Sequence, residues 1–338
     1  MENTNKKLLA VRLSALGDVA MTLPVVYSLA RQYPEVEIVL LTRPFFARLF
    51  INKPNNITLV EADYKGKHKG FLGTIKLLKE LSALKVDQVA DLHNVLRSWV
   101  IDGFFILKGK KVAMVDKTRG KRKEITSQKK RVEHINFIYR YINVFDRLGY
   151  RVDVNFKSLF EEIPAVSPIN IGNKAVGIAP FARFTTKTYP VEQMEEVVKE
   201  LTGSGIEVYL FGARGKEAQV LDKWQELYPN CTSLAGKYSI EEELAIISKL
   251  NVMLTMDSAN QHLSSLAGTP AITIWGGTTP ACGFLGYKQK STNAMCLNLD
   301  CQPCSIAGGE TCPLGTLDCM KKLSSQSVVE KIKSMIKQ

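Results

Sequence analysis

The alternation of short apolar runs with helical patterns constrains the fold of this chain more than any other feature. In the first half, β-branched runs at 8–13, 36–42, 57–61, 86–91 and 111–115 are separated by helical patterns such as 19–32 and 74–84. Strands that alternate with helices predict a parallel sheet with helices on both faces. The nearly continuous apolar run at 36–41 is typical of a strand buried on both sides.

This alternation stops at 156–174 and then starts again. The interrupting segment contains Pro164, Pro168, Asn170 and Gly172, which are residue types that favour turns and linkers. Further strands are expected at 175–179, 206–211, 252–255 and 271–275, with helices at 191–201, 217–227, 241–249 and 258–266. The sequence therefore predicts a second domain of the same kind.

The length of 338 residues allows two domains, each with its own core. We predict an N-terminal domain over 1–165, a C-terminal domain over 174–325, and a last helix within 326–338 that either stays with the second domain or crosses back to the first. The fold class is α/β, with two Rossmann-like, doubly wound parallel sheets. The carboxyl ends of their strands should face a shared cleft, where ligands bind in open α/β sheets.

Several functional classes are excluded by what the sequence lacks. No G-x-G-x-x-G follows the first strand and no G-x-x-x-x-G-K-[ST] occurs, which argues against an NAD-binding domain and a P-loop NTPase. No run reaches the roughly 18 apolar residues of a membrane span. The apolar run after Lys6 and Lys7 ends at Arg12, too early for a signal peptide, so a cytoplasmic protein is expected.

The positive charge is concentrated in one segment. The formal net charge is +12, and residues 108–131 hold eleven Lys or Arg but only two acids, Asp116 and Glu124. Such a patch favours an anionic partner, for example a phosphorylated glycolipid, a membrane surface or a nucleic acid, although a solvated loop would have the same composition.

Three polar clusters follow predicted strands. The first cluster, 12–18, ends in Gly17 and Asp18. The second, 255–262, leads from a strand into a helix whose start could bind a diphosphate. The third, 180–190, contains Arg183 and Lys187, which could hold phosphate oxygens. Taken singly, Asp18 and Asp257 could equally be capping residues of helices.

Together these clusters resemble the ADP-heptose:lipopolysaccharide heptosyltransferases, glycosyltransferase family 9. The first reads R-x-S-x-L-G-D before a helix with Leu23-Pro24, and the third has Lys187 before Tyr189-Pro190. The second resembles the family's D-S-G-x-x-H and L-x-x-x-x-G-T-P, here 257–262 and 263–270. The cysteines at 301–304, 312 and 319 are similar to the family's C-terminal pattern. Ala259 replaces the usual Gly, and Gly276-Gly277-Thr278 replaces the usual G-P-T, so another donor sugar is an alternative to heptose.

The resemblance implies a GT-B architecture and inverting transfer of a heptose from an ADP-sugar to a lipid A/core-type glycolipid at the cytoplasmic face of the inner membrane. It implies that Asp18 is the general base and that Lys187 neutralises the leaving diphosphate. The implied donor-site residues are Arg183, Thr186, Glu217, Asp257, Ser258, Ala259 and His262. Acceptor candidates in the first domain are Ser14, Gly17, Arg43, His93, Arg97, Arg119 and Arg122.

Two questions stay open at this stage. Cys301, Cys304, Cys312 and Cys319 begin with a C-x2-C spacing that could form a structural metal cluster, although no cofactor is expected to be required. The alternatives to a heptosyltransferase are an enzyme of the same fold with another nucleotide sugar, a catalytically inactive binding homologue, and a basic nucleic-acid-binding protein. The last is disfavoured because no nucleic-acid motif accompanies the basic segment.

Overall fold

The computed structural model describes residues 6–118, 120, 122–126 and 135–336, with only the backbone of Arg122 and Lys123. Its contacts divide the chain into two compact units: unit 1 holds the residues up to Lys117 and Phe137–Leu159, and unit 2 holds Thr118–Asn136 and the residues from Phe160 onward. The basic segment is thereby divided, whereas the sequence placed all of it in the first domain. Asn136 belongs with unit 2 because its Nδ2 donates to the carbonyl of Leu285 (2.8 Å).

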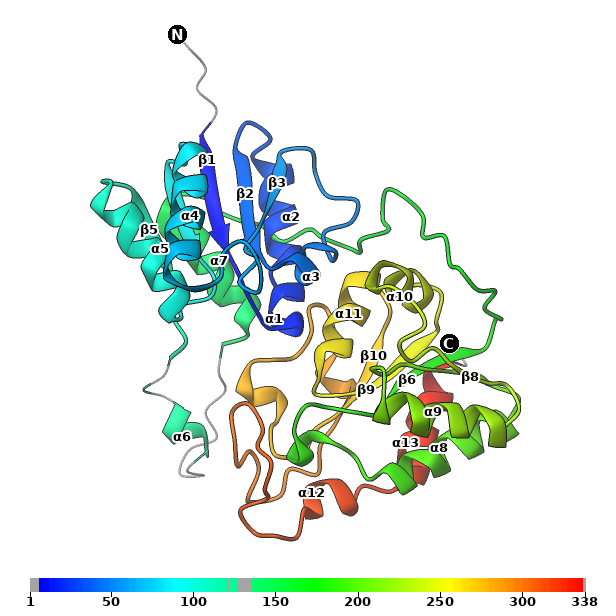
Figure 1. Ribbon diagram of the computed structural model, residues 1–338. Coiled ribbons are helices and arrows are strands. Elements are labelled where there is room, and N and C mark those ends of the chain that lie inside the picture. The colour runs from blue at the N-terminus through cyan, green and yellow to red at the C-terminus, as the bar shows by residue number, and fades with distance from the viewer. Residues whose placement is uncertain (1–5, 119, 121, 127–134, 337–338) are drawn as a thin grey trace. The chain divides into compact units, whose positions relative to one another are not determined.

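Unit 1 is a five-stranded parallel sheet in the order β3-β2-β1-β4-β5 (Figure 1). Its elements are β1 (Lys7–Val11), α1 (Leu16–Ala20), α2 (Leu23–Gln32), β2 (Glu37–Thr42), α3 (Pro44–Ala47), β3 (Ile57–Glu61), α4 (Gly70–Ala83), β4 (Gln88–Asp91), α5 (Leu96–Leu107), β5 (Lys111–Met114) and α7 (Phe137–Leu148).

Side chains along the strands of unit 1 point alternately to the two faces of its sheet. Leu9 and Val11 of β1 pack in one apolar cluster with Leu77 of α4 and Ile101 of α5, which places these two helices on the same face. Helices α2 and α7 contact each other, and α7 also packs on β4 and β5. The sheet is therefore doubly wound, as the sequence predicted.

Unit 2 is a six-stranded parallel sheet in the order β11-β10-β9-β6-β7-β8. Its elements are α6 (Arg122–Thr126), β6 (Ala175–Ala179), η2 (Thr185–Lys187), α8 (Val191–Gly203), β7 (Glu207–Leu210), α9 (Lys216–Leu227), β8 (Cys231–Ser233), α10 (Ile240–Ile247), β9 (Val252–Met256), α11 (Ala259–Ala267), β10 (Ala271–Ile274), η3 (Pro280–Cys282), η4 (Ser291–Asn293), β11 (Ala294–Met295), α12 (Asp318–Lys321) and α13 (Ser325–Ile336).

The last helix belongs to unit 2. Val328, Val329 and Ile332 of α13 are buried in the core of this unit, and Lys333 at its end forms an ion pair with Glu200 of α8 (3.1 Å). Helix α13 is thus packed on α8 and β9 of its own unit.

The fold class is confirmed, with a few local differences. The helix expected over 19–32 is split into α1 and α2, because Pro24 in the first turn of α2 has no N–H for the preceding turn. The short strands β8 and β11 were not predicted. None of the described helices combines the length and the apolar character that a membrane span requires.

Candidate functional site

The candidate residues gather where the strand order reverses in each sheet. In unit 1 the neighbours β1 and β4 are followed by helices that lead in opposite directions along the sheet, and in unit 2 the neighbours β6 and β9 are arranged in the same way. Ligands bind outside the carboxyl ends of strands at such switch points. The segments 12–18 and 92–97 leave β1 and β4, and the segments 180–187 and 257–262 leave β6 and β9.

Asp18 lies in the first turn of α1 and forms an ion pair with Arg12. Its Oδ2 is 2.6 Å from Nη2 of Arg12 and also accepts from the backbone N–H of Ala15 (3.3 Å). The Arg12 side chain is 4% exposed and Asp18 is 27% exposed, so the cation is buried and the carboxylate reaches the surface. No described residue donates to Oδ1 of Asp18, which is therefore available to a ligand.

Arg12 is fixed on its other sides by the core of unit 1. Its Nη1 donates to the carbonyl of Leu92 (2.5 Å), and its guanidinium lies 5.9 Å from the ring centre of Tyr141. Burial lowers the pKa of Arg12, but the charge of Asp18, the hydrogen bond to it and the nearby Tyr141 and Asp91 together outweigh burial, and the net shift is upward. Arg12 therefore holds Asp18 in place as a permanent cation.

Ser14 and His93 meet beside this ion pair. The Ser14 hydroxyl lies 3.3 Å from Nε2 of His93. Burial, followed by the positive charges of Arg12 and Lys117, lowers the pKa of His93 to about 3. His93 is therefore neutral at ordinary pH and can act as a hydrogen-bonding group without adding charge.

The loop that carries His93 is organised by Asp91 at the end of β4. Its Oδ1 accepts from the backbone N–H groups of His93 (2.7 Å) and Asn94 (2.9 Å), and its Oδ2 accepts from the Ser98 hydroxyl (2.7 Å). Asp102 is buried one turn along α5 from Ser98. Burial, then the charge of Asp91 and a hydrogen bond to it, raises the pKa of Asp102 to about 8, so it is protonated at neutral pH.

The other acceptor candidates are more dispersed. The Arg43 guanidinium stacks 5.5 Å from the ring centre of Phe46, and that of Arg97 lies 4.8 Å from the ring centre of Tyr64. Gly17 is the second residue of α1. Arg119 lies outside the described residues, and Arg122 opens α6 in unit 2 with its side chain outside them.

The centre of the site in unit 2 is an ion pair between Lys187 and Asp257. Nζ of Lys187 is 2.7 Å from Oδ2 of Asp257, and the side chains are 14% and 5% exposed. Asp257 also accepts from Thr278 at Oδ2 (2.6 Å) and from Gln261 at Oδ1 (3.0 Å). Both oxygens are thus occupied, which makes Asp257 an anchor for Lys187. An ammonium has three donor hydrogens, so Lys187 can still bind an anion.

A second set of bonds fixes the loop before Lys187. The Thr186 hydroxyl donates to the carbonyl of Gly309 and accepts from its N–H (both 2.9 Å). The N–H of Gly277 donates to the carbonyl of Thr186 (2.7 Å), a bond that the proline of the G-P-T pattern could not make because proline has no N–H. Gly308 has φ +93°, and a Cβ there would lie 2.5 Å from Cδ of Lys187. The departure at 277 therefore ties two loops together around Lys187.

Helix α11 begins next to this ion pair. Ser258 precedes its first residue, Ala259, and the Ser258 hydroxyl contacts that of Thr255 (3.0 Å) without capping the helix through its side chain. The N–H groups of the first turn of an α-helix lack helical partners and attract anions. His262 is buried within the same helix.

Two expected donor residues are engaged elsewhere. Arg183 is exposed and stacks on Phe184, with its guanidinium 5.1 Å from the ring centre. Glu217, in the first turn of α9, accepts from the backbone N–H of Ala213 (2.7 Å). Their contacts to a donor stay predictions.

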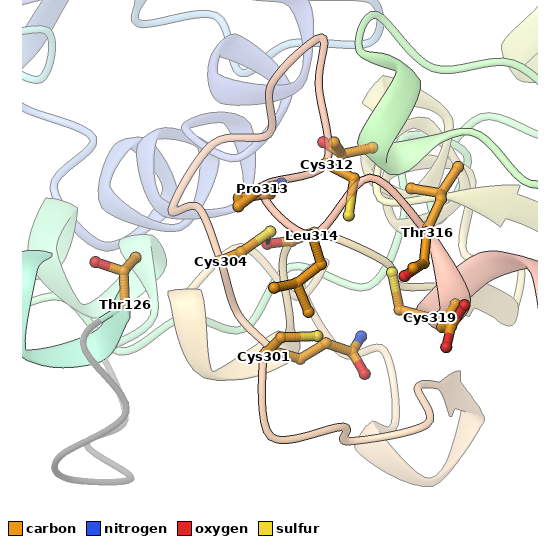
Figure 2. A pocket seen from close by; sticks show the side chains of 13 residues that line it. Thr126, Cys301, Cys304, Cys312, Pro313, Leu314, Thr316 and Cys319 are labelled. Carbon is orange, nitrogen blue, oxygen red and sulfur yellow. Dashed lines mark hydrogen bonds between the residues drawn. The ribbon is translucent and has the colours of Figure 1, made fainter.

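The four C-terminal cysteines surround a cavity of about 210 Å³ in unit 2, together with Leu314 and Pro313 (Figure 2). Among the described residues, however, no three Cys, His, Asp or Glu side chains are placed to hold a metal ion. A structural metal cluster at these cysteines stays a prediction. Burial raises the pKa of Cys312, but hydrogen bonds from the backbone of Leu317 and its neighbours outweigh burial and lower it.

Several residues that build the site were not selected from the sequence. Thr278 and Gln261 saturate Asp257, and Asp91 shapes the loop of His93. Gln261 lies in the first turn of α11 and Asp257 lies two residues before the helix begins, so the two side chains meet across the helix start. The contact of Thr278 spans 21 residues of sequence and gives no local signal.

Comparisons with known proteins identify the family of this chain. The model of glycosyltransferase family 9 (heptosyltransferase) matches residues 74–314. Lipooligosaccharide heptosyltransferase 2 of Campylobacter jejuni is 24% identical over 327 residues, which cover 95% of this chain and 96% of that protein.

Two solved structures share the fold. The glycosyl transferase family 9 protein of Veillonella parvula has a TM-score of 0.74 at 17% identity and covers 99% of this chain and 98% of its own. The E. coli heptosyltransferase WaaC, solved with ADP, has a TM-score of 0.69 at 17% identity and covers 97% and 99%; it was also solved with ADP-2-deoxy-2-fluoro heptose. The match of the family model over most of the chain, with relatives along nearly its whole length, shows that this protein belongs to glycosyltransferase family 9, the heptosyltransferases.

Proposed function

We propose that this protein transfers a heptose from ADP-heptose to a lipopolysaccharide-core acceptor, with inversion at the anomeric carbon. The observation that carries the proposal is the Arg12–Asp18 pair, in which a buried guanidinium orients a carboxylate that keeps one oxygen unbonded at a switch point of the sheet. A carboxylate in this position can take a proton from an acceptor hydroxyl within hydrogen-bonding reach.

Transfer with inversion is a single displacement at the anomeric carbon. Asp18 accepts the proton of the acceptor hydroxyl while the oxygen forms a bond to the anomeric carbon. The bond from that carbon to the β-phosphate oxygen breaks, and ADP leaves with the electron pair. Lys187 and the first turn of α11 stabilise the negative charge that develops on the diphosphate, as preorganised cations and helix N-termini do.

The donor assignment is supported by the similar fold of E. coli WaaC, which was solved with ADP and with ADP-2-deoxy-2-fluoro heptose. The chemistry needs both substrates in one place, and the cleft expected between the two domains stays a prediction. We place the reaction at the cytoplasmic face of the inner membrane, with the protein bound peripherally, because a lipid-linked acceptor would be presented there.

A transfer assay tests the proposal. Purified protein is incubated with ADP-heptose and a core acceptor that lacks heptose, and products are followed by mass spectrometry, with UDP- and GDP-sugars as alternative donors. We expect heptosylated product and ADP release only with the ADP-sugar. Product formation from a UDP- or GDP-sugar, with none from ADP-heptose, would refute the donor and favour another nucleotide sugar, the alternative that Ala259 and Gly277 keep open.

A further inference from the structure

Helix α5 exposes an apolar face that its own unit does not cover. Leu96 is 74% exposed, Val100 48%, Ile106 52% and Leu107 90%. These residues recur at helical spacing, whereas Ile101 and Phe105 on the opposite side are buried in the core of unit 1. A large contiguous apolar patch on a protein surface marks an interaction site.

The exposed side of α5 carries almost no charge. Between Leu96 and Leu107 the only ionisable residues are Arg97, at the start of the helix, and Asp102, which is buried. Gly103 lies at the middle of the exposed face, and a Cβ there would meet nothing within 4 Å. The face is therefore smooth and apolar over the length of the helix.

Helix α4 extends this face and adds positive charge beside it. Its first turn exposes Phe71 and Leu72, each 79% exposed, and Lys76 and Lys79 are exposed further along it. The two helices are neighbours on one face of the sheet, since Nζ of Lys108 at the end of α5 donates to the hydroxyl of Ser82 in α4 (2.5 Å) (Figure 1).

The segment that surrounds this face has an excess of positive charge. Residues 65–111 contain ten Lys or Arg and four acids, of which Asp91 and Asp102 are buried. A third, Glu80, is paired with Lys67 (3.4 Å) and His68 (3.1 Å). The fourth, Asp87, is paired with Lys110 (3.8 Å), so the segment that carries the apolar face has more exposed cations than exposed anions.

We propose that this α4–α5 face, defined by Phe71, Leu72, Leu96, Trp99, Val100, Ile106 and Leu107 with the adjoining lysines, docks on an anionic lipid bilayer. Helices that lie in a membrane interface combine apolar and aromatic side chains with a border of Lys and Arg. The apolar side chains would enter the acyl boundary, and the lysines would contact anionic headgroups. The inference rests on the proposed function only for its choice of a membrane, and its test needs neither substrate.

Trp99 provides a direct optical probe of this docking. The chain has three tryptophans, and Trp224 and Trp275 are buried to 1% and 0% exposure, while Trp99 is 41% exposed. With vesicles of phosphatidylethanolamine and phosphatidylglycerol we expect a blue shift of the emission and quenching by brominated lipids. Neutral phosphatidylcholine vesicles and high salt should both weaken the response.

A triple variant distinguishes docking through this face from nonspecific adsorption to vesicles. We expect Val100→Ser, Ile106→Ser and Leu107→Ser together to weaken flotation with the phosphatidylglycerol vesicles at least tenfold. The matched control is Leu227→Ser, 53% exposed on α9, which should bind as the wild type does. Circular dichroism and transfer to a water-soluble acceptor fragment verify that the triple variant is folded. If the wild-type protein itself shows no transfer, that result counts against the proposed function and not against membrane docking.

Three results would overturn the proposal: absence of wild-type binding to the anionic vesicles, unquenched Trp99 fluorescence in the bound state, or equal binding by the folded triple variant. Light scattering provides the competing outcome. A stable dimer that the same three substitutions dissociate would assign this face to a second copy of the chain instead.

Discussion

The two units place the same kind of ion pair at the same kind of sheet position, but the pairs differ in which partner is left available. In the Arg12–Asp18 pair the cation is buried, with Nη2 on Asp18 and Nη1 on the carbonyl of Leu92, and the carboxylate is 27% exposed with Oδ1 unbonded among the described residues. In the Lys187–Asp257 pair the carboxylate is the buried member, with hydrogen bonds to both oxygens.

This difference assigns opposite tasks to the two pairs. A carboxylate with an unbonded oxygen can accept a proton, whereas one that is saturated by three donors serves as the anchor of its cation. Two ion pairs of similar composition can therefore have different roles. The role of each pair depends on which partner already has its hydrogen bonds made within the fold and which partner can still bind a ligand.

Within unit 2, the largest effect on the rate of transfer is expected at Lys187. Lys187→Ala removes the cation proposed to stabilise the leaving diphosphate, and we expect kcat/KM to fall by roughly 10²- to 10³-fold. Lys187→Arg keeps the charge and serves as the control, with a smaller loss. Steady-state rates of ADP release measure both variants. Unchanged kcat/KM in Lys187→Ala would show that the cation has no role in transfer.

Loss of the carboxylate in the buried pair should be expressed mainly as loss of stability. Asp257→Asn leaves Lys187 without a counter-charge in a buried position, which should cost about 3 kcal/mol and lower Tm by roughly 10 °C. The matched control is Asp222→Asn, whose exposed pair with Lys237 (3.2 Å) should change Tm by less than about 2 °C. Equal melting shifts in the two variants would remove the contrast between buried and exposed pairs.

Asp102 tests the electrostatics behind the site of unit 1. Its pKa is raised to about 8 from 3.8, so the folded protein retains a proton that the unfolded chain releases, and stability falls as pH rises from about 4 to 8. Asp102→Asn, which keeps a donor for Asp91, should raise Tm by a few degrees at pH 8 and give no gain at pH 4. The exposed Asp146→Asn is the control. A gain that is independent of pH would contradict the assignment of a protonated Asp102.

The smallest effect is expected at His93. Its pKa is lowered to about 3 from 6.5, so the unfolded chain binds a proton that the folded protein resists, and stability falls as pH decreases from about 6.5 to 3. His93→Gln, which retains a side-chain donor near Ser14, should reduce this acid-induced loss and change kcat only a few fold. Thermal melts between pH 3 and 7 provide the measurement. A kcat that titrates with a pKa near 6.5 in the wild type, and not in the variant, would show that His93 ionises and acts in catalysis.

The sequence was sufficient for the parts of the fold that depend on local periodicity. The β-α alternation predicted five strands of unit 1 and four of unit 2, and the break at Pro164–Gly172 lies within a segment without helix or strand. Strands β8 and β11 have three and two residues, too few to show a period, and were missed. The split between α1 and α2 depends on Pro24, and a proline inside a helical pattern is a sequence signal for such a break.

The candidate site was predictable as a set of residues and not as a set of bonds. Asp18, Lys187 and Asp257 were chosen from motifs, and each lies at a switch point. Their different states depend on contacts between distant segments, such as Arg12 with Leu92 and Asp257 with Thr278, which no local pattern encodes.

The role of Asp18 as the general base is tested most directly by comparing transfer and ADP binding in Asp18→Asn. The variant is measured by single-turnover transfer to the core acceptor and by isothermal titration with ADP. We predict that kcat falls by about 10³-fold while the Kd for ADP stays within twofold of the wild type, because a general base acts on the acceptor and not on the nucleotide. Wild-type turnover by Asp18→Asn, or loss of ADP binding equal to the loss of rate, would contradict the account.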